Sequence, residues 1–186
     1  MSFFLRAKHW QIFVLVVGPA FISFAILVAA MIIFKRFELL PWFFLPMVLV
    51  NIVQYCWFFI VGNKLYRNLP GKVRLSRGLF GFCAIYPCLY VLFFAAVWAP
   101  LFFRGMLISN GDTNPLAFLV IFPFHFLAAI CTLFVFYFAA KALRSVELQK
   151  PARSSDYIGD FFLMVFFIVG VWVLQPRINK IFDEQI

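Results

Sequence analysis

The chain has 186 residues, of which 66% are hydrophobic and only 12% are charged, with a net charge of +9 and a mean hydropathy of +1.01. Because a soluble domain is roughly half apolar and about a quarter charged, this composition excludes that class and indicates an integral membrane protein. The basic residues lie in short loops between apolar runs, where they orient the chain and contact anionic lipid. We therefore expect no nucleic-acid partner.

Four apolar segments are long enough to cross the hydrocarbon layer of a bilayer, which is about 30 Å thick. None of them contains Lys, Arg, Asp or Glu. The first segment is longer than the roughly 7–15-residue core of a cleaved signal peptide, so it is expected to be retained. We predict transmembrane helices over residues 10–34, 39–62, 79–103 and 115–140.

A fifth apolar segment, near the C-terminus, leaves two alternatives open. Residues 161–174 alone would form only about 21 Å of helix, which is too short to span. A helix over residues 156–175 would approach about 30 Å and would place Asp160 inside the interface. Pro176 is expected to stop the helix in either case. We predict a short membrane helix over about 156–175, which is either a tilted fifth crossing or a re-entrant helix.

Loop charges orient the chain by the positive-inside rule. With a cytoplasmic N-terminus, that side carries eleven basic residues against five, or thirteen against three if the fifth segment is re-entrant. We therefore predict a cytoplasmic N-terminus. The candidates for contact with lipid headgroups or a partner protein, besides serving as plain topological anchors, are Lys64, Arg67, Lys72, Arg74, Arg77, Lys141 and Arg144.

The two predicted hairpins, residues 10–67 and 79–144, resemble each other at an offset of about 77 residues. In this alignment Pro46 matches Pro123. Lys64 and Arg67, after the second segment, match Lys141 and Arg144, after the fourth. Parallel repeats of this kind occur in transporters. Two unrelated phenylalanine-rich hairpins would align about as well, so duplication of one hairpin unit is a hypothesis.

Polar side chains at similar depth in the four segments form a candidate intramembrane cluster. Amide, hydroxyl and imidazole groups are costly in hydrocarbon unless they are hydrogen-bonded, so we expect them to face neighbouring helices. Packing between helices is the favoured interpretation, and a substrate or ion pathway is the alternative. The residues of the predicted cluster are Ser23, Asn51, Gln54, Tyr55, Tyr90, His125 and Thr132.

The sequence predicts no catalytic residue, no metal site and no cofactor. Metal sites need clustered ligands, whereas His9 and His125 are far apart and isolated. The cysteines show no CxxC spacing and are expected to act as small hydrophobic residues. No GxSxG, HExxH or phosphate-binding glycine motif occurs. His125 is interpreted first as a packing residue and second as a gate or proton relay.

Two stretches, "KHWQIF" at residues 8–13 and "YIGDFFLMVFFIVGVWVLQPRINKIF" at residues 157–182, resemble a group of small, uncharacterised bacterial multi-spanning membrane proteins. The resemblance implies a location in the bacterial inner membrane and supplies no activity or site residue.

Taken together, these features predict an all-α polytopic membrane helix bundle. The function expected first is a non-enzymatic accessory, assembly or effector module, which acts by helix packing against a membrane protein partner or a second copy. The alternative is a small oligomeric channel or transporter with a polar pathway at the membrane midplane.

Overall fold

The structure is a computed structural model that describes residues 3–35, 42, 44–108 and 115–183. Within these residues the protein is helical and has no strand. Four stretches are long and apolar enough to cross a membrane, namely His9–Phe34, Phe44–Arg67, Arg77–Gly105 and Leu119–Leu148. The all-helical class and the four candidate crossings are therefore confirmed.

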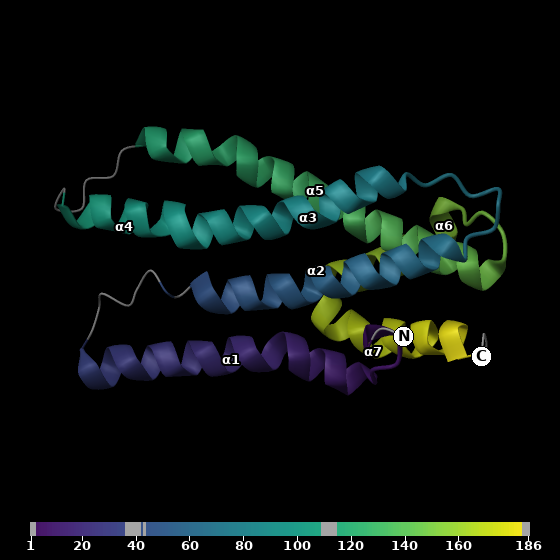
Figure 1. Ribbon diagram of the computed structural model, residues 1–186, viewed down its shortest axis with the longest axis horizontal. Coiled ribbons are helices and arrows are strands. Elements are labelled where there is room, and N and C mark those ends of the chain that lie inside the picture. Colours follow the sequence, from purple (N-terminus) through teal and green to yellow (C-terminus); the bar gives the residue numbers. More distant parts are fainter. Residues whose placement is uncertain (1–2, 36–41, 43, 109–114, 184–186) are drawn as a thin grey trace.

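The chain begins with a 3-10 turn, η1, and continues through long antiparallel helices (Figure 1). The bounds of the elements in this part are η1 Phe3–Leu5, α1 His9–Phe34, α2 Phe44–Arg67, α3 Arg77–Phe93, η3 Phe94–Trp98, α4 Ala99–Ile108 and α5 Pro115–Leu148. Helices α2 and α5 run in the same direction, and α1 and α3 run in the opposite one (Figure 1).

The third crossing is a single path made of α3, η3 and α4, and its middle part η3 is a π-helix. Pro100 lies two residues after the end of this part. Proline lacks an amide hydrogen, and its ring clashes with the carbonyl four residues earlier in a regular α-helix. A wider turn before the proline relieves that clash and lets the helix continue.

Close packing joins α2, α3 and α5. The rings of Phe80 and Phe138 stack with centroids 4.1 Å apart, and both side chains are fully buried. Gly62 makes this possible, because a Cβ atom there would lie 2.4 Å from the Phe80 ring. By contrast, the buried residues of α1 are only Ile12 and Val16, both near its beginning. The rest of α1 offers an apolar surface, as expected of a helix that faces lipid.

The predicted fifth helix over about 156–175 is wrong as a single element. The chain forms α6, Ser154–Val165, and α7, Phe167–Asp183, with a break at Phe166, where φ is −91° and ψ is 52°. Figure 1 shows that α6 runs into the bundle and α7 returns, so that both chain ends lie at the same end of the bundle. We call this unit the C-terminal hairpin, and call the bundle end that holds both termini the N-terminal end.

Pro176 does not stop the last helix, because α7 continues through it to Asp183. Pro176 lies on the exposed side of α7. The carbonyl that loses its hydrogen-bond donor is that of residue 172, whose side chain is also exposed. The lost hydrogen bond therefore falls on the outer face of the helix and leaves the buried face intact.

Candidate functional site

The predicted intramembrane cluster is divided into separate contacts. On α2 and α5, the Tyr55 and Thr132 hydroxyls form a hydrogen bond. Thr132 donates to the carbonyl of Ala128 at 2.8 Å, so Tyr55 is the donor to Thr132. Tyr55 and Thr132 are separated by 77 residues, which is the offset of the predicted repeat. Contact at matched positions of two parallel helices is what a duplicated hairpin would produce, and the duplication stays a prediction.

A second contact joins α3 to α5. The Tyr90 hydroxyl lies 3.0 Å from Nδ1 of His125, and the two rings meet edge to face with centroids 5.6 Å apart. Tyr90 is buried, whereas His125 is exposed on the surface of the described chain. His125 therefore contacts α3 at the surface of the bundle, where its ring meets that of Tyr90.

The remaining members of the cluster lie apart from these two contacts. Ser23 donates to the carbonyl of Ala20 at 3.0 Å, and Asn51 donates to the carbonyl of Met47 at 2.9 Å. Both bonds stay within one helix. Gln54 is half-buried on α2. The structure therefore brings Tyr55 to Thr132 and Tyr90 to His125 without assembling one continuous polar site.

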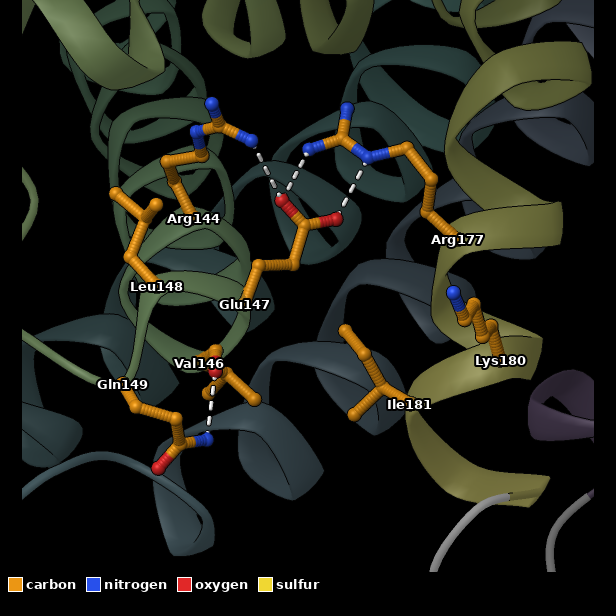
Figure 2. Close-up of a pocket in the computed structure, with 8 residues that line it drawn as sticks. All are labelled: Arg144, Val146, Glu147, Leu148, Gln149, Arg177, Lys180 and Ile181. Atoms are coloured by element: carbon orange, nitrogen blue, oxygen red, sulfur yellow. Dashed lines mark hydrogen bonds and ion pairs between the residues drawn. The ribbon is translucent and has the colours of Figure 1, made fainter.

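A charged cluster that the sequence analysis missed joins α5 to both helices of the C-terminal hairpin. Arg177 binds Glu147 through two hydrogen bonds, Nε to Oε1 and Nη2 to Oε2, each 2.7 Å long. It also binds Asp160 through two bonds, Nη1 to Oδ1 at 2.5 Å and Nη2 to Oδ2 at 2.9 Å. Arg144 adds a bond from Nη1 to Oε2 of Glu147 at 3.0 Å. Figure 2 shows both arginines converging on Glu147.

The cluster is largely shielded from solvent. The side chains of Arg177, Glu147 and Asp160 are 27%, 20% and 9% exposed. The hydrogen bonds to Asp160 and to Glu147 raise the pKa of Arg177 above its ordinary value, so the guanidinium stays charged. Planar, two-point pairing between a guanidinium and carboxylates is the strongest form of such contacts. Arg177 therefore fastens the C-terminal hairpin to the end of α5.

Gln175 forms a second buried connection. It is 0% exposed and its Oε1 accepts a hydrogen bond from Nε1 of Trp57 at 2.8 Å. Its Nε2 lies 2.8 Å from the carbonyl oxygen of Phe4, 3.0 Å from that of Ala7 and 2.9 Å from Oδ1 of Asn179. This single amide thus links α2, α7 and the start of the chain.

We expect Gln175→Leu to lower the free energy of unfolding by about 1–3 kcal/mol, because it leaves buried polar groups without partners. The change would be measured by thermal and denaturant unfolding of the full chain in mild detergent. Trp57→Phe removes the indole N–H that donates to Gln175. The double variant should therefore lose less stability than the sum of the two single variants. Strict additivity would contradict the buried connection.

Contacts between the two ends of the chain extend this connection. The rings of His9 and Trp172 have centroids 4.7 Å apart, and Phe13 lies 5.7 Å from the same indole. Asn179 donates to the carbonyl of Ala7 at 3.0 Å. The stretches at residues 8–13 and 157–182 are therefore packed against each other.

The predicted headgroup-contact residues gather at the N-terminal end of the bundle, where α2 and α5 finish and α3 starts (Figure 1). Some already have partners within the protein. Nζ of Lys141 donates to the Tyr137 hydroxyl at 2.9 Å, and Nε of Arg77 donates to Oδ1 of Asn63 at 3.0 Å. Their contact with lipid or with a partner protein stays a prediction.

Reactive and metal-binding groups are sparse in the described part of the chain. The cysteines are free; Cys83 and Cys131 are buried, and Cys56 is exposed. No group of three or more His, Cys, Asp or Glu side chains is placed to hold a metal ion among the residues that the structure describes.

Comparison with protein-family models, with curated proteins and with solved structures gives no match.

Proposed function

We propose that the protein is a non-enzymatic module of the bacterial inner membrane, which acts by packing against a membrane protein partner or a second copy. The observation that carries this proposal is that the intramembrane polar groups form hydrogen bonds within the protein. Tyr55 bonds to Thr132, Tyr90 bonds to His125, and Asn51 bonds within its own helix. The first two of these bonds join different helices, and hydrogen bonds between helices hold them together in lipid.

The orientation proposed is a cytoplasmic N-terminus with a re-entrant C-terminal hairpin. Helix α7 returns to the N-terminal end of the bundle (Figure 1), and its residues Arg177 and Lys180 lie opposite the end of α5 (Figure 2). This is the end that already carries most of the loop cations. This supports the distribution with thirteen basic residues on the cytoplasmic side and three on the other side, in place of eleven and five. The backbone at the break stays hydrogen-bonded, because the amide of Phe166 donates to the carbonyl of Phe162 at 2.9 Å and its carbonyl accepts from the amide of Gly170 at 2.8 Å, as a helix break in a membrane requires.

The cavity between α2 and α3 also supports packing over transport. It has a volume of about 270 Å³ and is lined by apolar side chains and by Tyr55 and Cys56. The Tyr55 hydroxyl is used by Thr132, so the cavity offers few polar groups to a hydrated ion. An ion pathway needs polar or charged lining along its length.

A small transporter is the second candidate, and the C-terminal hairpin favours it. Transporters often use broken or re-entrant helices near a charged site, and this hairpin is broken at Phe166 and holds Asp160 and Arg177. In such a role the ion pairs would exchange partners with a substrate. Here Arg177 already makes four hydrogen bonds to two carboxylates, out of the five N–H donors of a guanidinium, which supports a fastening role first.

Flux measurements with the purified full chain in sealed liposomes separate the two candidates. We expect no proton, cation or anion flux above that of protein-free vesicles, while an added ionophore shows that the vesicles are sealed and polarised. A flux that His125→Leu abolishes without loss of folding would overturn the packing proposal and support transport.

Tyr55→Phe should lower the stability of the protein by about 0.6–2 kcal/mol, because it removes one hydrogen bond between membrane helices. The expected loss is measured as a shift in the unfolding midpoint in detergent. Tyr66→Phe is a matched control, since the ring of Tyr66 stacks on Phe138 and the phenyl ring keeps that contact. Equal effects of the two substitutions would argue against the Tyr55–Thr132 contact.

A further inference from the structure

His125 leaves one of its two ring nitrogens without a hydrogen bond. Its Nδ1 lies 3.0 Å from the Tyr90 hydroxyl, and no group among the described residues pairs with its Nε2. A neutral imidazole carries one donor and one acceptor. Whichever role Nδ1 takes toward Tyr90, Nε2 therefore keeps the opposite capacity unused.

This nitrogen lies far from either end of its membrane helix. His125 is ten residues after Pro115, where α5 begins, and sixteen residues before Lys141, which corresponds to about 15 Å and about 24 Å of helix. Its side chain is exposed on the surface of the described chain, so hydrocarbon would surround Nε2 in a monomer. Because hydrocarbon cannot hydrogen-bond to it, the position requires a polar group from outside the chain.

The side of α5 around His125 is open to such a contact. Figure 1 shows the first half of α5 at the outer edge of the bundle, beside α3 and α4. Phe122, Phe126 and Leu133 are 65%, 58% and 51% exposed, and Ala129 is exposed one turn after His125. We call the exposed side formed by these five residues the His125 face. The small side chain of Ala129 lets another helix come close to the imidazole.

A second copy of the chain supplies the missing hydrogen bond at the matching depth. Two copies inserted with the same topology are related by a two-fold axis along the membrane normal, so a residue near the axis faces the same residue of the other copy. One imidazole can then donate from Nε2 while the other accepts at Nε2, with Tyr90 as the donor to Nδ1 in the first copy and the acceptor in the second. Lipid chains offer no such group.

We propose that the His125 face is a homodimer interface, in which the imidazoles of two copies hydrogen-bond through Nε2 within the membrane. This assignment rests on the proposed function, because it names a second copy as the partner against which the protein packs. The rings of Phe122 and Phe126 already stack with centroids 6.3 Å apart. They present an apolar surface beside the imidazole that packs against the other copy and excludes lipid from the pair.

Energy transfer between donor-labelled and acceptor-labelled full chains in liposomes would measure this association over a range of protein-to-lipid ratios. We expect His125→Leu to weaken the association about tenfold, which is the effect of one hydrogen bond between membrane helices. His125→Gln should stay within about threefold of the parent, because an amide of similar length also donates and accepts. His9→Leu is the matched control, since His9 contacts Trp172 outside the His125 face, and it should change the association by less than about twofold.

Ala129→Trp is a second variant should His125→Leu unfold. It keeps the imidazole but blocks the approach of another helix, so it should weaken the association in the same direction. Energy transfer no higher than that of randomly distributed monomers would overturn the interface, as would equal effects of His125→Leu and His9→Leu.

The flux measurement in sealed liposomes separates a failure of this interface from a failure of the proposed function. A monomer without flux would overturn the homodimer and leave packing against a different membrane protein as the function. A flux would overturn the proposed function, whether or not the chain forms dimers.

Discussion

Replacing Arg177 by methionine is expected to cost about 3–5 kcal/mol of stability, because it leaves two largely buried carboxylates without their main cation. Glu147 would keep only Arg144, and Asp160 would lose both of the hydrogen bonds that it receives from Arg177. The loss would be measured by denaturant unfolding of the full chain in mild detergent. We also expect faster proteolysis of residues 154–183, since Arg177 fastens the C-terminal hairpin to α5.

Two further variants separate the ion pairs from a general loss of charge. Arg74→Met removes a positive charge from an exposed loop and should change stability by less than about 0.5 kcal/mol. Adding Asp160→Leu and Glu147→Leu to Arg177→Met should recover much of the loss, because apolar residues of similar size can replace a buried ion cluster. If Arg177→Met unfolded at the parent midpoint, the fastening role would be refuted.

The transmembrane part of the fold was predictable because hydropathy reports directly on contact with lipid. The limits of this signal appear at α5, which the sequence predicted to end at residue 140 and which ends at Leu148. Lys141 ends the apolar run, but the helix continues beyond it to Leu148. Ala142, Leu143 and Val146 continue as buried residues, so the last turns of α5 are held by other helices and not by lipid.

The sequence reveals more of the intramembrane polar cluster than of the contacts made by Arg177 and Gln175. Asn51, Gln54 and Tyr55 share a face through a local helical spacing, which marked α2 as carrying polar groups. The hydroxyl contact that forms there joins residues 77 apart. The missed contacts also join residues that are far apart in the chain, with Arg177 lying 30 residues from Glu147 and Gln175 lying 118 residues from Trp57.

No local spacing predicts such long-range contacts, because they depend on how the C-terminal hairpin turns. Asp160 was visible in the sequence as a lone acid beside an apolar run, but it resembled an ordinary charge at a helix start. Gln175 is equally visible, but its place before Pro176 predicts only the end of a helix. Only the return of α7 along α6 gives both residues their partners.

The turn itself depends on Gly170, and Gly170→Ala is expected to open the C-terminal hairpin. A Cβ atom at this position would lie 1.9 Å from the carbonyl oxygen and 2.7 Å from the carbonyl carbon of Leu163. Both are backbone atoms, so no side chain can move aside to make room. Overpacking in a core typically costs about 1–3 kcal/mol, and a clash with backbone should reach the upper part of this range or exceed it.

Gly159→Ala is the matched control, because it lies on α6 and an added Cβ would meet nothing within 4 Å. Alanine should favour that helix by about 1 kcal/mol over glycine, so the two substitutions are expected to shift the unfolding midpoint in opposite directions. Opening the hairpin would also separate Asp160 from Arg177, so Gly170→Ala combined with Arg177→Met should lose less than the sum of the two single variants. Similar midpoints for Gly170→Ala and Gly159→Ala would mean that α6 and α7 do not approach each other at this glycine.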